Sequence, residues 1–160
     1  MPHPTFVAIH LSITICSNSP HMQVHKFGGA SINSLDRIHG VGHIIRHHAH
    51  LPSLAVISAM GKTTNALEKV AEAFYAQRMQ DALQLFAQVK QQHLTTAKYL
   101  LVMQYNVCAE QLNNFFTEAE WLLHDKPVRE YDYYYDQLVC IGELLSSTIL
   151  SFYLKEIHID

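Results

Sequence analysis

Charged residues are scarce in this 160-residue sequence: Lys and Arg together number 11, Asp and Glu number 14, and the formal net charge is −3. Electrostatic binding to nucleic acid or to an anionic membrane needs a concentration of positive charge, which this composition does not supply. We therefore expect no nucleic-acid partner and no membrane partner. The 49% hydrophobic content and the chain length predict a soluble protein with one ordinary core.

Cysteine is also rare, and apolar runs are short. Cys16, Cys108 and Cys140 are odd in number and share no CxxC spacing, which is typical of reduced thiols in a cytoplasmic protein. The longest apolar run near the amino terminus, residues 6–16, is well below the ~20 residues of a membrane helix, and no Lys or Arg precedes it. The sequence therefore predicts a cytoplasmic location, with neither a membrane span nor a signal peptide.

Glycine and proline are absent between Gly61 and Pro127. Within this stretch apolar residues recur at helical spacing in three stripes, which favours several helices packed as hairpins over one very long helix. We expect a largely helical segment over about residues 64–125. The stripes are Leu67, Val70, Ala71 and Phe74; Leu83, Phe86, Val89 and Leu94; and Leu112, Phe115, Phe116, Ala119 and Leu122.

Two strand–loop–helix units precede this segment. Residues 24–27 alternate and run into a pair of glycines, and a helix is expected from its N-cap, Ser34, to about residue 48. The unbroken apolar run at residues 54–57 predicts a strand buried on both faces, followed by a helix capped by Thr63 or Thr64. Two such units in succession indicate a parallel sheet with a crossover helix.

The two ends of the chain carry further patterns. Residues 5–16 alternate strictly between apolar and other residues, as a strand does. We expect residues 1–21 to be an N-terminal extension of a domain at residues 22–160; an additional strand on a sheet edge is the alternative. One helix is expected from about Tyr131 to Lys155.

Two apparent motifs have simpler explanations. The Gly61-Lys62-Thr63 tripeptide matches the end of a P-loop, but Val56 stands where that motif needs a glycine, and this argues against a Walker-type NTPase. His39, His43 and His47 share one face of a helix, yet no carboxylate pattern accompanies them. We interpret them as a solvated polar face and expect no metal site.

Glu143 lies on the predicted C-terminal helix in one stripe with Asp132, Asp136 and Ser147. These acids could simply face water. Gly142 argues for more than that, because a glycine inside a helix costs ~1 kcal/mol relative to Ala and so marks a place where another group comes close. That group could be a ligand beside Glu143 or a neighbouring helix.

Three segments, in this order, resemble the aspartate kinases (aspartokinases) of the amino-acid kinase superfamily: KFGGAS at residues 26–31, VISAMGKTTN at residues 56–65 and DQLVCIGE at residues 136–143. Related kinases share the first segment, whereas the other two are more specific. The resemblance implies an α/β fold, a three-layer αβα sandwich of the amino-acid kinase type, truncated, with a largely helical insertion. Ala30 and Cys140 depart from the family, which often has Thr and Ser there.

The resemblance also implies a reaction. Aspartate kinases transfer the γ-phosphoryl group of ATP, bound with Mg²⁺, to the side-chain carboxylate of L-aspartate, the first step towards lysine, threonine and methionine. Such a nucleophile is already ionised at neutral pH, so that catalysis rests on positioning and charge stabilisation. The roles implied by motif position are catalysis by Lys26, phosphate binding by Lys26, Gly28, Gly29 and Ser31, and substrate binding by Ser58, Thr64 and Glu143.

The second half of the family's catalytic domain, which binds the nucleotide, has no counterpart in this sequence. We therefore expect the N-terminal portion of an aspartate kinase catalytic domain, which forms a homo-oligomer and does not turn over aspartate and ATP by itself. Two other interpretations stay open. One is a different carboxylate kinase of the same superfamily, and the other is a non-catalytic helical interaction module.

Overall fold

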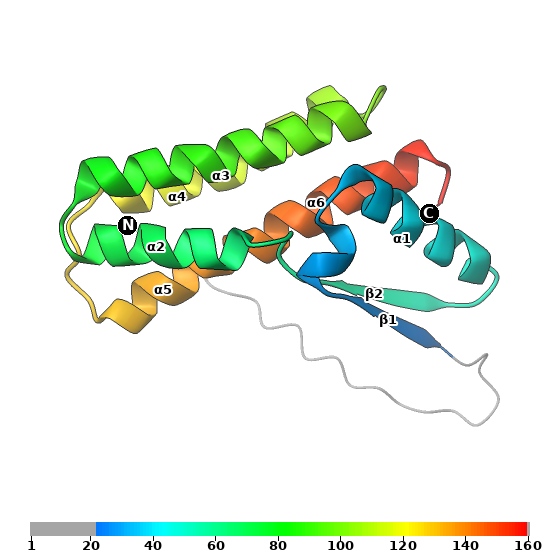
Figure 1. The fold of residues 1–160 in the computed structure, drawn as a ribbon, viewed down its shortest axis with the longest axis horizontal. Coiled ribbons are helices and arrows are strands. Elements are labelled where there is room, and N and C mark those ends of the chain that lie inside the picture. Colours follow the sequence, from blue (N-terminus) through cyan, green and yellow to red (C-terminus); the bar gives the residue numbers. More distant parts are fainter. Residues whose placement is uncertain (1–21, 160) are drawn as a thin grey trace, which may run out of the picture.

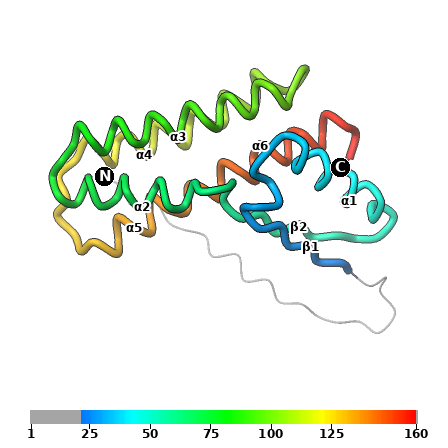
Figure 2. Tube along the Cα trace, in the orientation of Figure 1, coloured from blue at the N-terminus to red at the C-terminus, as the bar shows by residue number. Residues whose placement is uncertain are grey.

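The computed structural model describes residues 22–159, so the predicted extension at residues 1–21 and its strand pattern lie outside the described residues. In Figures 1 and 2 the strands and α1 lie at one end, α2 to α5 at the other, and α6 runs between them. The elements are β1 (Gln23–Phe27), the 3₁₀ turn η1 (Gly29–Ile32), α1 (Leu35–His48), β2 (Ser53–Ile57), α2 (Thr63–Tyr75), α3 (Met79–Leu100), α4 (Tyr105–His124), α5 (Tyr131–Val139) and α6 (Ile141–Glu156).

The two described strands form a parallel pair, as the sequence predicts. The register runs from Gln23 opposite Ser53 to Phe27 opposite Ile57. Helix α1 is the crossover between them, and its N-cap is Ser34, whose hydroxyl oxygen accepts a hydrogen bond from the backbone N–H of Arg37 at 3.4 Å. Both strands therefore end at the same edge of the sheet, where Phe27 and Ile57 lead into the two predicted loops.

The expectation that β2 is buried on both faces is wrong. Leu54 and Val56 are 46% and 43% exposed, and Val24 in β1 is 63% exposed. The register pairs Val24 with Leu54 and Lys26 with Val56, so that these side chains share one face of the sheet. Helices α1 and α6 pack on the opposite face (Figure 1). No described element covers the first face, and its apolar side chains stay open to solvent.

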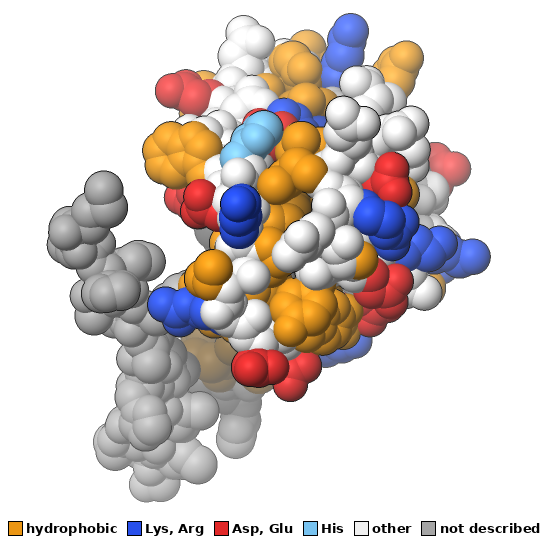
Figure 3. Space-filling model, turned by 90° about the vertical axis from the view of Figure 1, so that its left-hand side faces the viewer, with side chains coloured by type: hydrophobic (Ala, Val, Ile, Leu, Met, Phe, Trp, Pro, Cys, Tyr) orange, Lys and Arg blue, Asp and Glu red, His pale blue; other side chains and the backbone are white. Residues whose placement is uncertain are grey.

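The helical part buries the three predicted stripes. Helix α2 packs against α3 and α5, α3 packs against α4, and α4 packs against α6. Phe86 and Phe116 meet edge to face in this core, with their ring centroids 6.1 Å apart. The outer surface at the far end of these helices mixes apolar side chains with charges of both signs (Figure 3). The hairpin arrangement predicted from the absence of Gly and Pro is confirmed.

The single helix expected from Tyr131 to Lys155 is two helices, α5 and α6, which meet at Cys140. The hydrogen bonds across this junction are long: the N–H of Cys140 donates to the Asp136 carbonyl at 3.3 Å, and that of Leu144 to the Cys140 carbonyl at 3.4 Å. The combined span Tyr131–Glu156 is long and apolar enough to cross a membrane, but 56% of its most apolar window is buried inside the molecule. A helix that is mostly buried in the core of a protein passes the same test of length and composition.

Candidate functional site

The first loop begins where β1 ends. Gly28 is extended, with φ −75° and ψ 166°, and it leads into η1, in which the N–H of Ser31 donates to the Gly28 carbonyl at 2.8 Å. Lys26 is exposed, and its ammonium nitrogen would lie 3.4 Å from a Cβ placed on Gly28. The Lys26 cation therefore lies beside the glycine pair, as a phosphate-binding arrangement requires.

The second loop, residues 58–61, lies directly against the first. The N–H of Ser58 donates to the Phe27 carbonyl at 3.1 Å, and the N–H of Gly61 donates to the Gly29 carbonyl at 3.0 Å. A Cβ on Gly29 would come within 2.4 Å of the Ala59 carbonyl oxygen, a separation that no side chain allows. Gly61 has φ +57°, which favours glycine as well. The two loops thus fit together because glycine occupies both positions.

Helix α6 contacts the second loop from the other side. The N–H of Ala59 donates to Glu143 Oε1 at 3.3 Å, and the N–H of the next residue, Met60, donates to Ser146 Oγ at 2.8 Å. Glu143 is half-buried and Ser146 is buried. Glu143, predicted from its motif, therefore joins the same site as Lys26 and the glycine pair.

Gly142 is explained by packing. A Cβ on this residue would lie 2.9 Å from the Cβ of Ala59 and 3.3 Å from the Cγ2 of Thr63. Of the two possibilities that the sequence left open, the neighbour is part of the protein, namely the second loop and the start of α2. The glycine lets α6 approach this loop closely enough for Glu143 and Ser146 to reach its amides.

Neither threonine caps α2, so that prediction is wrong. The helix begins at Thr63 itself, its N-cap is Lys62, and no side chain caps it. The hydroxyl of Thr63 instead donates to the Met60 carbonyl at 2.6 Å, which ties the second loop to the helix that follows it. Thr64, the predicted substrate residue, is half-buried in the first turn of α2.

The charges at this site have no counter-ions within the described part of the chain. The ion pairs there are Arg78–Asp81 and Lys90–Glu120, both in the helical part. Lys26 and Glu143 belong to neither. Partial desolvation, with the Glu143 carboxylate as a second cause, raises the pKa of the exposed Cys140 thiol above its ordinary value. Among the described residues the site thus holds the Lys26 cation beside the glycine pair and, where α6 meets the second loop, the Glu143 carboxylate, which accepts the Ala59 N–H but has no cationic partner.

The other sequence candidates lie apart from this site. His39, His43 and His47 are exposed, as expected of a solvated face. Asp132 and Asp136 are exposed as well, so the interpretation that these acids face water holds for them, whereas Glu143 is half-buried against Ala59. The predicted stripe of acids is interrupted because α5 and α6 meet at Cys140.

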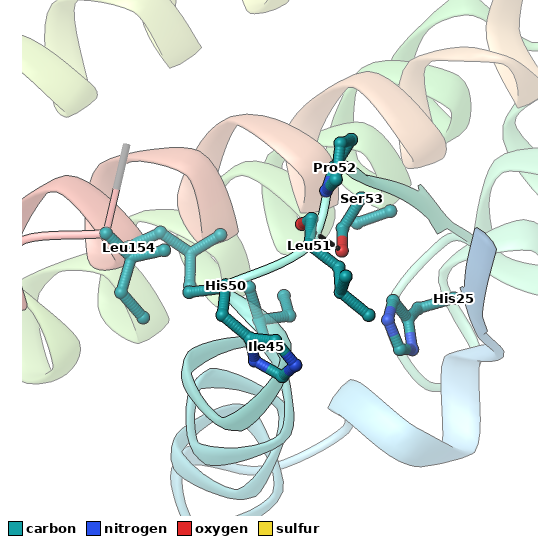
Figure 4. A pocket seen from close by; sticks show the side chains of 10 residues that line it. His25, Ile45, His50, Leu51, Pro52, Ser53 and Leu154 are labelled. Carbon is teal, nitrogen blue, oxygen red and sulfur yellow. Dashed lines mark hydrogen bonds between the residues drawn. The ribbon is translucent and has the colours of Figure 1, made fainter. Parts of the chain in front are cut away.

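A separate cavity of about 450 Å³ lies between β2, the end of α1 and the end of α6 (Figure 4). His25, His50 and Leu154 line it. In its wall the Ser53 hydroxyl donates a hydrogen bond to the Leu51 carbonyl at 3.0 Å. Ser53, the first residue of β2, lines it, whereas the two loops follow the last residues of the strands. It is therefore distinct from the site formed by Lys26, the two loops and Glu143.

Sequence reasoning did not find Ser146, and it assigned Thr63 to a helix cap instead of to the Met60 carbonyl. Both side chains form hydrogen bonds with the backbone of Met60, and Ser146 lies 86 residues after Met60 in the chain. A serine inside a helix commonly binds the carbonyl four residues earlier, as Ser146 also does with Gly142 at 2.8 Å. The only local signal for Ser146 is its position one helical turn after Glu143.

The family model for the amino acid kinase family matches residues 21–160. The chain belongs to the amino acid kinase family. The match includes both loops and α6, and thus all the residues that form the candidate site.

Curated relatives of this family member include plant aspartokinases. The chain is 31% identical over 138 residues to aspartokinase 2, chloroplastic, of Arabidopsis thaliana, and 31% identical over 144 residues to aspartokinase 1, chloroplastic, of the same plant. The matches cover 84% and 85% of this chain, and 24% of each relative. This family member therefore spans about a quarter of the length of the curated relatives that it matches.

Solved structures confirm the fold. Escherichia coli aspartokinase III in complex with lysine and aspartate superposes with a TM-score of 0.75 at 22% identity. The superposition covers 87% of this chain and 30% of the aspartokinase chain. The same enzyme in complex with aspartate and ADP gives a TM-score of 0.73 at 23% identity, over 86% of this chain and 29% of the enzyme. The predicted α/β fold of the amino-acid kinase type is confirmed, with its small parallel sheet and its mostly helical remainder.

Proposed function

We propose that this chain is the aspartate-binding, N-terminal part of an aspartate kinase catalytic domain. The observation that carries the proposal is the environment of Glu143. Its carboxylate is half-buried, accepts the Ala59 N–H through one oxygen at 3.3 Å, and has no cationic partner among the described residues. A half-buried, unpaired carboxylate favours a cationic ligand group. The α-ammonium of L-aspartate is such a group. The aspartokinase relatives and structural neighbours support this choice of amino acid.

The acceptor carboxylate would then lie towards Lys26. Bound by its ammonium at Glu143, aspartate would extend along the second loop, with Ser58 and Thr64 as hydrogen-bonding groups and its side-chain carboxylate directed to the glycine pair. Lys26, Gly28, Gly29 and Ser31 would stabilise the charge of the transferring γ-phosphoryl group. The product would be 4-phospho-L-aspartate. No general base is needed, because the attacking carboxylate is ionised at neutral pH.

ATP and Mg²⁺ are the implied co-substrate and ion. Mg²⁺ in kinases is held by a carboxylate or two together with the phosphates of the nucleotide. The described residues of the site offer one carboxylate, Glu143, which is already bonded to Ala59. We propose that Mg²⁺ enters with ATP, and we assign it no residue of this chain.

Calorimetric titration with L-aspartate tests the acceptor site. We expect Glu143→Gln to weaken binding about tenfold or more, since the amide keeps an oxygen for the Ala59 N–H but loses the charge that attracts the ammonium, and hydrogen bonds to charged groups are worth about 1.5–3 kcal/mol. Glu110→Gln, an exposed change on α4, is the matched control and should leave the affinity unchanged.

N-acetyl-L-glutamate and L-glutamate discriminate against a different carboxylate kinase. Equal binding of either compound and aspartate would contradict the aspartate assignment. If no amino acid binds to the unmodified chain, the non-catalytic helical module becomes the better interpretation.

We also expect no turnover of aspartate and ATP by these 160 residues alone, because phosphoryl transfer needs nucleotide, metal and acceptor held together. A coupled assay of ADP release measures this directly. In a chain extended by a nucleotide-binding half, Lys26→Ala should lower kcat by about 10²–10³-fold, as removal of an electrostatic stabiliser does, while Glu143→Ala should chiefly raise the KM for aspartate. Aspartate-dependent ADP release by the 160-residue chain, lost in Lys26→Ala, would contradict this proposal.

Assembly and location are the remaining parts of the proposal. The open sheet face around Val24, Leu54 and Val56 favours self-association, and we propose a homo-oligomer that light scattering can detect. We propose a cytoplasmic location, with no nucleic-acid or membrane partner. The named Arabidopsis relatives are chloroplastic, so that fractionation of the source cells should compare both compartments.

A further inference from the structure

We propose that Ser146 is a positioning residue for aspartate binding, which it promotes by fixing the second loop against α6. This inference rests on the proposed function for its ligand, but its structural basis is independent of it. Ser146 is 2% exposed and belongs to no motif that suggested the site. It cannot contact a ligand, so any effect on aspartate must act through the loop.

Ser146 joins the loop to the helix with both of its hydrogen-bonding functions. Its hydroxyl donates to the Gly142 carbonyl at 2.8 Å, and its oxygen accepts the N–H of Met60 at 2.8 Å. Met60 is itself 3% exposed, and its carbonyl accepts the Thr63 hydroxyl at 2.6 Å. The N–H and the C=O of Met60 are therefore both held by buried side chains.

Glu143 and Ser146 accept hydrogen bonds from two consecutive amides, and they lie three residues apart on one face of α6. Glu143 accepts the N–H of Ala59 at 3.3 Å, a longer hydrogen bond than the 2.8 Å bond from Met60 to Ser146. The shorter and more deeply buried bond fixes the peptide next to Ala59. The orientation of the Glu143 carboxylate, and with it the oxygen left for the substrate ammonium, then depends on the bond made by Ser146.

The opposite side of the loop leaves no room for it to shift. The N–H of Gly61 donates to the Gly29 carbonyl, and the Ala59 carbonyl lies against Gly29 so closely that a Cβ there would be 2.4 Å away. The loop is thus held between the glycine pair and α6. Release at Ser146 should loosen the aspartate side of this arrangement first, since Gly61 keeps its bond to Gly29.

Ser147 provides a matched control within the same helix turn. Its hydroxyl also donates to the carbonyl four residues earlier, that of Glu143, at 2.6 Å, but it accepts no hydrogen bond from the loop. Ser147→Ala therefore removes the same kind of intrahelical hydrogen bond as Ser146→Ala and leaves the Met60 N–H untouched. Any difference between the two variants reports on the bond between helix and loop.

The experiment measures amide hydrogen exchange and aspartate binding on Ser146→Ala and Ser147→Ala in the 160-residue chain. In Ser146→Ala the buried Met60 N–H loses its acceptor, so we expect exchange at residues 59 and 60 to rise at least tenfold and the Kd for L-aspartate to rise about tenfold, which is about 1.4 kcal/mol. Ser147→Ala should change neither quantity. Ser146→Cys, which keeps the size but is a weaker acceptor, should fall between Ser146→Ala and the unmodified chain, and it replaces Ser146→Ala if that variant does not fold.

The two readouts separate the two hypotheses. Faster exchange at Met60 with an unchanged Kd for aspartate would show that the loop opens without affecting the ligand, and would overturn the positioning role while the proposed function stands. Equal exchange in Ser146→Ala and Ser147→Ala would also overturn it. Absence of aspartate binding by the unmodified chain would instead remove the proposed function, and the positioning role with it.

Discussion

The helical part of the molecule and its sheet differ in how completely they bury their own apolar residues. In α2, Leu67, Val70 and Phe74 are all 0% exposed, whereas Leu54 and Val56 of β2 are 46% and 43% exposed. The helices pack against one another as hairpins, so each apolar stripe meets its partner within the described residues. Within residues 22–159 the parallel sheet has two strands, and helices cover one of its faces.

This contrast bears on the candidate site, which lies where the two parts meet. Lys26 and the glycine pair belong to the sheet, Glu143 and Ser146 belong to α6, and the second loop connects them. We infer that the helical part supplies most of the stability and acts as a rigid support, while the sheet supplies Lys26 and the glycine loop that follows it. The following predictions test that division.

Phe116→Ala should have the largest effect. Phe116 is 1% exposed and packs edge to face on Phe86, and truncation of a buried Phe costs about 3–5 kcal/mol. Val56→Ala removes side-chain atoms from a residue that is 43% exposed and should cost less than about 1 kcal/mol. Urea denaturation followed by circular dichroism measures both. Equal losses for the two variants would contradict the idea that the helical part dominates the stability.

Gly142→Ala should have an intermediate effect on stability, because the added methyl group would crowd the contact between α6 and the second loop. The new Cβ would meet Ala59 at 2.9 Å and Thr63 at 3.3 Å; overpacking costs about 1–3 kcal/mol, and the better helix propensity of Ala returns ~1 kcal/mol. We expect a net loss of about 1 kcal/mol and weaker aspartate binding.

Gly40→Ala is the matched control in α1. Apart from its own helix backbone and its chain neighbours, no described atom lies within 4 Å of its Cβ position, so this variant should gain about 0.5–1 kcal/mol of stability from helix propensity. Thermal melts of the two variants side by side give the comparison. A stabilised Gly142→Ala would mean that the loop can move away from α6 at no cost.

His93 should give the smallest effect, visible as a pH dependence of the helical part. Burial lowers its pKa from the ordinary value of 6.5, and its Nδ1–H donates to the Val89 carbonyl at 2.8 Å while Nε2 is buried. The folded state therefore resists protonation, whereas the unfolded chain takes up a proton as the pH falls through 6.5. The stability that His93 contributes is present above that pH and is lost below it.

The measurement is the melting temperature at pH 7 and at pH 5. The unmodified chain should lose more between the two values than His93→Leu does, since the variant lacks this group and keeps the other histidines. An identical loss in both proteins would assign the acid sensitivity to histidines elsewhere, such as those near the sheet.

The sequence by itself determined the elements whose signals are local. Period-two and period-3.6 patterns predicted β1, α1 and the helical hairpins, and Ser34 was identified as an N-cap from its own neighbourhood. The order of the three motifs predicts that Lys26, Ser58, Thr64 and Glu143 belong to one site. Two local patterns mislead: the four apolar residues at 54–57 predict a strand buried on both faces, and the uninterrupted helical pattern over residues 131–155 gives no sign of the junction at Cys140.

Only the tertiary structure decided what surrounds each of these residues. Nothing near Gly142 in the chain indicates that Ala59 and Thr63 approach it, and nothing near Ser146 indicates that it accepts the Met60 N–H. These contacts join segments far apart in sequence: Glu143 lies 84 residues after Ala59, and Ser146 lies 86 residues after Met60. The burial of β2 is likewise set by what covers the sheet. A local pattern records what a segment can bury or bond, whereas its partner is fixed by the packing of elements distant in sequence.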